Sequence, residues 1–414
     1  MTERDLVLVA LGTRPEAIKL LPVIRELSGH PDLAVRVVAT GQHREMVDQI
    51  LAPFGMKPDY DLEIMRSEQT LNEIVCRVIP LLERLYAELA PKMVLVQGDT
   101  TSAFAAALAA FHRRISVGHV EAGLRTFDRL NPFPEETNRR MISSVADLHL
   151  AATPGAAKNL LREGIPPEEI VVTGNTVIDS LLGILSRPQL LDDHRLGDFP
   201  LGLPDPLVLI TLHRRENWLP NAALRGSSPL EEVLLGIRDA AEAFPKARFV
   251  YPVHRNPRVQ EQARRILGER PNVHLLDPLA HIPFVDLMSR STVILTDSGG
   301  IQEEAPSLGV PVLVARETTE RPEAVTSGAN RMVGTDRGNV GAALRRHLEV
   351  PVRRPGTWPF PSPYGDGQAS ARIREAVLFR LGRGKRPSDF RPDVLPPPSA
   401  PSAVENPVTH GGST

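Results

Sequence analysis

A short turn formed by Ser298, Gly299 and Gly300 has the clearest chemical meaning in the sequence. It follows an apolar segment at 292–295 and opens a helical pattern. Two glycines let backbone N–H groups come close to a ligand, and the free N–H groups at a helix start attract anions. These residues therefore predict a cradle for the diphosphate of a nucleotide. The alternative is a strand-to-helix turn that uses glycine only for its backbone geometry.

Charged residues follow this turn and a second one near the N-terminus. Glu303 and Glu304 lie one helical turn beyond the glycines, where carboxylates can accept hydrogen bonds from ribose hydroxyls. Arg14 and Lys19 flank the turn after the first apolar segment, so an anion at that helix start would meet two cations. The alternative for Arg14 and Lys19 is a pair of solvated surface charges.

Three acids in the first half of the chain are candidates for a ligand site. Asp99 and Glu121 each come directly after an apolar segment, and Glu135 follows in a proline-bounded loop. The carboxyl ends of parallel strands meet at one edge of a sheet, where ligands bind. Asp99 could instead cap the helix that follows it, and Glu121 could be a surface acid. Because all three follow a strand or a rigid loop at one predicted edge, we interpret them as residues of a ligand site and not as incidental acids.

The elements that must position these residues alternate regularly. Apolar segments of strand length, such as 93–96 and 207–211, alternate with helical patterns in both halves of the chain. This alternation predicts parallel sheets, and therefore an α/β protein with two doubly wound domains facing a central cleft. No Gly-x-Gly-x-x-Gly motif follows the first strand of either domain, so the usual NAD fingerprint is missing.

The domain boundaries follow from composition and from the same alternation. The first domain, residues 1–180, carries these three acids, and the second, residues 206–365, carries the diphosphate cradle. A stretch without clear periodicity links them at 187–205. Residues 366–385 form a helix expected to pack back on the first domain. Residues 386–414 are mostly Pro, Ser, Gly and polar residues, and are predicted to be a disordered tail.

Composition excludes several classes of function. The net charge of −2 and the 4% aromatic content give no support for binding to nucleic acid or to an anionic membrane. No apolar run approaches the roughly 20 residues of a membrane span, and the N-terminus lacks a signal-peptide core. Cys76 is the only cysteine, which excludes an internal disulfide and any zinc site built from several cysteines. We therefore expect a cytoplasmic protein.

Many sequence blocks, in the same order, resemble the non-hydrolysing UDP-N-acetylglucosamine 2-epimerase family. The resemblance extends from about residue 5 to residue 382. The blocks that carry it include Gly12-Thr13-Arg14-Pro15-Glu16, Gln97-Gly98-Asp99-Thr100-Thr101, Gly118-His119-Val120-Glu121-Ala122-Gly123, Thr173-Gly174-Asn175-Thr176, His213-Arg214-Arg215-Glu216, Asp297-Ser298-Gly299-Gly300 and Thr319-Glu320-Arg321-Pro322-Glu323.

The resemblance implies a fold, an activity and a set of site residues. The fold is the glycosyltransferase-B type with two Rossmann-like domains, usually in a homodimer. The activity is the interconversion of UDP-GlcNAc and UDP-ManNAc without cofactor or metal, which serves cell-envelope polysaccharide. The implied catalytic residues are Asp99, Glu121, Glu135 and His213. The implied substrate-binding residues are Arg14, Lys19, Phe284, Ser298, Gly299, Gly300, Glu304 and Arg321. Many bacterial members bind a second UDP-GlcNAc as activator, here near Gln42, His43, Gln69, Arg215 and His254.

Elimination chemistry explains why such an enzyme needs both acids and a diphosphate site. Carbon 2 of a pyranose is not next to a carbonyl, so its proton becomes removable only as UDP leaves carbon 1 and a glycal forms. A stabilised diphosphate favours that departure, and carboxylates can remove and return the proton. Three alternatives use the same cradle: a glycosyltransferase with an acceptor site, a non-catalytic UDP-sugar sensor, and a hydrolysing relative that releases free ManNAc. The residues leave open which acid removes the proton and which returns it.

Overall fold

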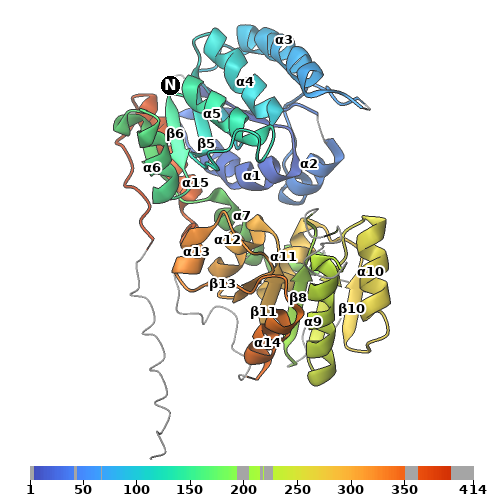
Figure 1. Cartoon of the computed structure of the whole chain (residues 1–414). Helices are drawn as coiled ribbons and strands as arrows, with labels where there is room; N and C mark the ends of the chain where they lie inside the picture. The colour runs from blue at the N-terminus through green and yellow to red at the C-terminus, as the bar shows by residue number, and fades with distance from the viewer. Residues whose placement is uncertain are drawn as a thin grey trace, which may run out of the picture.

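The computed structural model describes residues 4–41, 44–66, 68–193, 205–214, 218, 227–349 and 362–392. Within them the chain forms two parallel sheets, one above the other in Figure 1. The first has seven strands in the order β3-β2-β1-β4-β5-β6-β7, and the second has six in the order β10-β9-β8-β11-β12-β13. The prediction of two doubly wound α/β domains is therefore confirmed.

The first sheet comprises β1 (Asp5–Leu11), β2 (Leu33–Ala39), β3 (Tyr60–Asp61), β4 (Met93–Gln97), β5 (Ser116–Ala122), β6 (Leu148–Ala151) and β7 (Ile170–Val172). Its helices are α1 (Arg14–Ser28), α2 (Arg44–Leu51), α3 (Leu71–Leu89), α4 (Thr101–His112), α5 (Glu135–Val145) and α6 (Pro154–Arg162), with short 3₁₀ turns at Ala52–Phe54 and Pro167–Glu169. The second sheet comprises β8 (Leu207–Thr211), β9 (Arg248–Pro252), β10 (Val273–Leu276), β11 (Val293–Thr296), β12 (Val312–Val314) and β13 (Asn330–Met332). Its helices are α9 (Pro229–Ala243), α10 (Pro257–Leu267), α11 (His281–Ser289), α12 (Gly299–Ser307), α13 (Pro322–Thr326) and α14 (Arg337–Leu348).

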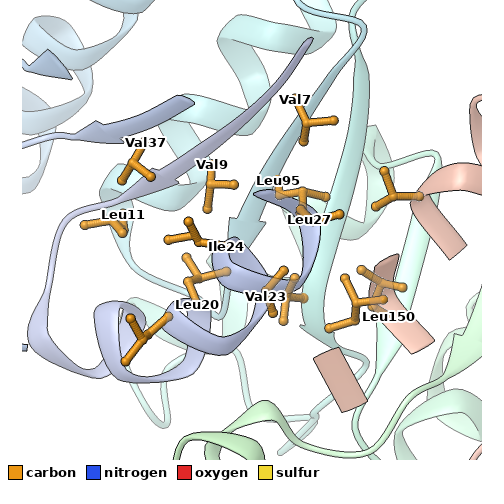
Figure 2. Packing of buried hydrophobic residues seen from close by; sticks show 14 of the residues in the cluster. Val7, Val9, Leu11, Leu20, Val23, Ile24, Leu27, Val37, Leu95 and Leu150 are labelled. Atoms are coloured by element: carbon orange, nitrogen blue, oxygen red, sulfur yellow. The ribbon is translucent and has the colours of Figure 1, made fainter. Parts of the chain in front are cut away.

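Buried apolar side chains cover both faces of the first sheet. Successive residues of a strand point to opposite faces, so β1 contributes one set of side chains to each of two clusters. On one face, β1 packs against α1, as Figure 2 shows for Val7, Val9, Leu11, Leu20, Val23, Ile24 and Leu27. On the other face, Leu8 and Ala10 pack with residues of α3 and α4. A strand buried on both sides reads as a continuous apolar run, which is why the sequence revealed it.

Two passages of chain connect the sheets. The first is α7 (Thr176–Leu185), which packs against α1 of the first sheet and against α11 and α12 of the second. The second brings the chain back to α15 (Ala369–Arg380), which packs on α1 and α7 (Figure 1). Buried Asp179 of α7 fixes the start of α15 by accepting hydrogen bonds from the backbone N–H groups of Ala369 and Ser370, at 3.2 and 2.7 Å.

Parts of two segments that were predicted to be irregular have defined structure. The linker expected at 187–205 begins with a helix, α8 (Pro188–Asp193), because Leu190 is buried against α7 and α11. Residues 386–392, assigned to the tail by composition, lie along the edge strand β7. There the N–H of Phe390 donates to the carbonyl of Val172 at 2.7 Å, and the Phe390 ring is buried. Predicted disorder is therefore wrong for 386–392, and residues 393–414 lie outside the described residues.

Among the residues that the structure describes, no helix has both the length and the apolar character needed to cross a membrane.

Candidate active site

The predicted site residues gather where each sheet reverses its strand order. The reversals fall between β1 and β4 in the first sheet and between β8 and β11 in the second. Ligands bind at such switch points, beyond the carboxyl ends of the strands. Lys19 lies in α1 after β1, Asp99 follows β4, His213 follows β8 and Ser298 follows β11.

Glu121 occupies an unusual position at the end of β5. Its φ of 64° lies in the left-handed region, and the register between β5 and β6 shifts there. A bulky residue rarely adopts this conformation, and such strained residues cluster at functional sites. The carboxylate is almost buried, and both of its oxygens accept hydrogen bonds from Lys19 Nζ at 2.6 Å. Gln97 Nε2 also donates to it. The turn thus aims a charged group into the protein and not towards solvent, so Glu121 is not a surface acid.

Lys19 remains charged despite its environment. Burial lowers the pKa of Lys19, but the carboxylates of Glu121 and Glu303 outweigh this effect and leave the pKa above its ordinary value. The sequence suggested an anion-binding role for Lys19. In the structure its nearest anion is the candidate acid–base group Glu121.

The second sheet contributes a matching ion pair. Arg321, just before α13, donates from Nε to Glu303 Oε1. The negative charge of Glu303 raises the pKa of Arg321 further, although burial opposes this. The other oxygen of Glu303 accepts a hydrogen bond from Asn175 Nδ2 at 2.7 Å. Glu303 is thus held by two partners, and Glu304 is the carboxylate beside the glycine turn.

The Ser298 turn has the features of an anion cradle. Ser298 is the N-cap of α12, but its side chain makes no capping hydrogen bond. Neither Gly299 nor Gly300 has a positive φ, so backbone conformation does not require glycine here. Two guanidinium groups lie beside Gly299: a Cβ added there would be in ordinary van der Waals contact, 3.5 Å from Arg321 Nη2 and 3.9 Å from Arg214 Nη2. Helix N–H groups and two guanidinium groups therefore converge at this turn.

An unbroken series of contacts joins the two halves of the predicted site. Glu121 accepts from Asn175 Nδ2 at 3.3 Å, and Asn175 donates in turn to Glu303. Glu303 pairs with Arg321, whose guanidinium lies against Gly299. The acid of the first sheet and the cradle of the second are thus brought together.

Asp99 does not cap the helix that follows it. The N-cap of α4 is Thr100, whose hydroxyl accepts a hydrogen bond from the first turn. Asp99 instead accepts from Arg139 Nε at 2.7 Å and is 27% exposed, so it can reach a ligand. The preceding residue, Gly98, is fixed by buried His119, whose Nε2 lies 2.7 Å from the Gly98 carbonyl. Burial lowers the pKa of His119 to about 3, so this imidazole is neutral and donates.

The adjacent acids Glu135 and Glu136 differ sharply. Glu136 is fully buried and accepts hydrogen bonds from Arg139 Nη1 and from the backbone of Thr126, both at 3.0 Å. Glu135 begins α5, and its Oε2 is buried without a hydrogen-bond partner among the described residues. Buried polar atoms are nearly always paired, so an unpaired carboxylate oxygen suggests a place for a ligand. Glu135 therefore stays a candidate for contact with a ligand, whereas the oxygens of Glu136 are occupied by hydrogen bonds within the protein.

The remaining predicted residues surround this centre or lie outside the described residues. Arg14 begins α1, and Phe284 lies on α11 together with His281. Burial lowers the pKa of His281 to about 4, and the positive charge of Arg14 adds to this effect. His213 Nδ1 lies 3.2 Å from Asp297 Oδ1, and its ring stacks on His254 with centroids 6.4 Å apart. In the expected activator group, Gln69 accepts from Arg77, whereas Gln42, His43 and Arg215 lie outside the described residues.

Sequence reasoning missed Gln97 and Asn175. Both donate to Glu121, yet Asn175 is separated from it by 54 positions in the chain. The available signal was their place beside predicted turns, directly before Gly98 and directly after Gly174. The described ranges contain no group of three or more His, Cys, Asp or Glu side chains placed to hold a metal ion.

Replacing Glu304 by Gln is expected to make stability less sensitive to pH. Burial, with a contribution from Glu303 and against that of Lys19, raises the pKa of Glu304 to about 8 from its ordinary 4.5. Folding therefore favours the protonated form, and stability is lost as the pH rises from about 4.5 to 8. The Tm of Glu304→Gln should exceed that of the wild type by a margin that widens over this range and is constant above it. Thermal melts of ligand-free protein from pH 5 to 9 measure the margin, with exposed Glu242→Gln as control; a margin independent of pH would contradict the shift.

Comparison of the chain with known proteins identifies its family. The family described as UDP-N-acetylglucosamine 2-epimerase matches residues 25–378. The chain is 47% identical to the UDP-N-acetylglucosamine 2-epimerase of Escherichia coli (strain K12) over 377 residues, which cover 90% of this chain and 98% of that protein. It is 45% identical to the Bacillus subtilis (strain 168) protein of the same name over 389 residues, 93% of this chain and 98% of the relative.

A solved structure agrees in fold as well as in sequence. The crystal structure of UDP-GlcNAc 2-epimerase from Neisseria meningitidis bound to UDP-GlcNAc has a TM-score of 0.80 and 44% identity to this chain. The match covers 90% of this chain and all of the other. The similarity therefore includes both sheets and the residues between them, and the chain belongs to the UDP-N-acetylglucosamine 2-epimerase family.

Proposed function

We propose that this protein inverts carbon 2 of UDP-N-acetylglucosamine to give UDP-N-acetylmannosamine, and catalyses the reverse reaction. One observation carries the proposal: Glu121, the candidate acid–base carboxylate, is linked through Asn175 and the Glu303–Arg321 pair to a glycine turn suited to a diphosphate. The bound UDP-GlcNAc in the Neisseria meningitidis relative supports the choice of substrate.

The proposed reaction is elimination followed by re-addition. A carboxylate takes the proton from carbon 2, the bond between carbon 1 and the diphosphate oxygen breaks, and UDP leaves with the bonding electrons. A glycal with a double bond between carbons 1 and 2 remains. Return of a proton to the opposite face of carbon 2, with re-addition of UDP at carbon 1, completes the inversion. Atoms and charge balance without an external oxidant or reductant.

The charged side chains divide between these two tasks. Arg321, Arg14 and the N–H groups at Gly299 and Gly300 stabilise the departing diphosphate, in surroundings where charge is weakly screened. Asp99, Glu121 and Glu135 form the acid–base pool. Lys19 pairs with Glu121, and an incoming diphosphate offers Lys19 a second anion.

Turnover in deuterated water is expected to place deuterium at carbon 2 of both sugars. The label enters because the proton that returns comes from a carboxylate that exchanges with solvent. Incubation with UDP-GlcNAc alone, followed by proton and phosphorus NMR, measures the label and the attachment of UDP. UDP-ManNAc formed without label would contradict the elimination route, release of free ManNAc would indicate hydrolysis, and absence of turnover until an acceptor is added would indicate a transferase.

We propose further that the enzyme is a cytoplasmic homodimer that supplies ManNAc for cell-envelope polysaccharide, with a second UDP-GlcNAc binding as activator. The resemblance described in the sequence analysis motivates the dimer, the pathway and the activator, and the composition motivates the cytoplasmic location. Rates that rise more steeply than hyperbolically with UDP-GlcNAc, together with a mass of two chains in light scattering, are the expected results. A hyperbolic rate curve would contradict the binding of an activator, and the mass of a single chain would contradict the dimer.

A further inference from the structure

Both connections between the sheets meet at Asn175. The first leaves β7 through Thr173, Gly174 and Asn175 and enters α7. The second returns through Tyr364, whose carbonyl accepts a hydrogen bond from the backbone N–H of Asn175 at 2.6 Å. A Cβ added to Gly365 would lie 3.3 Å from the Asn175 carbonyl, so the two passages are in direct contact. A movement of one sheet relative to the other would therefore alter the contacts at Asn175.

Asn175 is only 3% exposed, and both polar atoms of its side chain make hydrogen bonds within the protein. Its Oδ1 caps α7 by accepting a hydrogen bond from the N–H of Val177 at 3.1 Å. Its Nδ2 donates to Glu303 Oε2 at 2.7 Å and to Glu121 Oε1 at 3.3 Å. The amide has two N–H hydrogens, and each has a carboxylate acceptor, one from each sheet.

Only an amide suits all three contacts. A hydroxyl has one hydrogen and cannot donate to both carboxylates, whereas a carboxylate would cap the helix but donate to neither. The two acids carry opposing cations on their far sides, Lys19 on Glu121 and Arg321 on Glu303. A neutral donor between them therefore completes a balanced group of four charges.

We propose that Asn175 is a positioning residue that sets the distance between the acid–base carboxylate and the diphosphate cradle. This inference rests on the function proposed above. The amide ties Glu121 to Glu303, and through Arg321 to the turn at Gly299, at the point where both chain connections touch. Acid and leaving group can then meet the same substrate in a fixed geometry, and a misplacement of about 1 Å can cost about 100-fold in rate.

The substitution Asn175→Asp tests this role because it keeps the helix cap. Aspartate and asparagine are comparable N-caps, so α7 should remain formed. The new carboxylate, however, faces Glu121 and Glu303 without a hydrogen to donate. At pH 8 we expect kcat to fall about 100-fold and KM to change less than about threefold. As the pH is lowered towards 6, part of the activity should return, because a protonated carboxyl group can donate to one neighbour.

Two further variants separate positioning from folding. Asn256 caps α10 as Asn175 caps α7, because its Oδ1 accepts a hydrogen bond from the N–H of Arg258 at 2.9 Å, but Asn256 is not part of the bridge between Glu121 and Glu303. Asn256→Asp should therefore leave kcat within twofold of the wild type. The double variant Asn175→Asp/Glu303→Gln exchanges amide and carboxylate across the contact, so it should recover at least tenfold over Asn175→Asp alone. Circular dichroism and the Tm monitor folding in each case.

The outcomes are decisive in both directions. Asn175→Asp with kcat within threefold of the wild type overturns the inference, as does a double variant no better than the single one while both are folded. If Asn175→Asp alone fails to fold, a folded and active double variant still supports the bridge, and an inactive one refutes it. Failure of the proposed function is distinct, because the wild type itself would then leave carbon 2 unlabelled in deuterated water.

Discussion

Replacing Glu121 by Gln should lower turnover by about 10²–10⁴-fold, the usual contribution of a general acid or base. Glutamine keeps the shape of the side chain and can still accept a hydrogen bond from Lys19, which now lies 2.6 Å from both carboxylate oxygens. It cannot take up a proton. The affinity for UDP should change little, since Glu121 belongs to the acid–base side of the site.

Turnover of UDP-GlcNAc followed by NMR, and UDP binding measured by calorimetry, test this expectation. The matched control is Glu242→Gln, which removes a half-exposed carboxylate paired with Arg270 at 3.0 Å on α9, away from the switch points. The control should retain wild-type turnover. A Glu121→Gln enzyme with more than about a tenth of wild-type turnover would remove Glu121 from the acid–base pool.

The second large effect is expected for Arg321→Gln. This change removes the guanidinium beside the glycine turn, so the departing diphosphate loses a charged donor, at a cost of about 10²–10³-fold in turnover. UDP affinity should fall as well, because we expect the guanidinium to bind the diphosphate before elimination too. The change also leaves Glu303 buried without its cation, and breaking a buried pair commonly costs about 3–5 kcal/mol of stability.

A double variant separates the catalytic loss from the structural one. Arg321→Gln/Glu303→Gln removes both charges, so the unpaired buried carboxylate disappears and the Tm should recover most of its loss. Turnover and UDP affinity should stay low, because the cation at the cradle is still missing. If turnover returned together with the Tm, Arg321 would serve folding alone, and the diphosphate would depend on Arg14 and the turn.

The sequence revealed those parts of the molecule that depend on local pattern. The alternation of apolar segments and helical patterns predicted both sheets, because a parallel strand buried on two faces is apolar throughout. The Ser298 turn was identifiable because strand, glycines and helix are contiguous in the chain. Placing Asp99 and Glu121 at strand ends brought them to the same edge of the sheet without knowledge of any contact.

What the sequence could not supply depends on distant contacts. Asn175 looks like an ordinary N-cap, and only the meeting of two separate chain passages gives its amide two carboxylates. Glu135 and Glu136 are indistinguishable as neighbours in the sequence, yet Arg139 pairs with Glu136, whereas Oε2 of Glu135 has no hydrogen-bond partner among the described residues. Composition likewise suggested disorder from residue 386, because it does not show that Asp389 and Phe390 form hydrogen bonds with Val172 of the edge strand β7.

The segment at 386–392 has a practical consequence for shortened forms of the protein. It occupies hydrogen-bonding groups of β7 that would otherwise face solvent: Val172 donates to Asp389 at 2.9 Å, and Arg386 donates to the Ile170 carbonyl at 2.8 Å. A sheet border stripped of such cover invites strands from other molecules and so favours aggregation. A crystallographer trimming the proline-rich terminus would do better to cut after Pro392 than after the last helix.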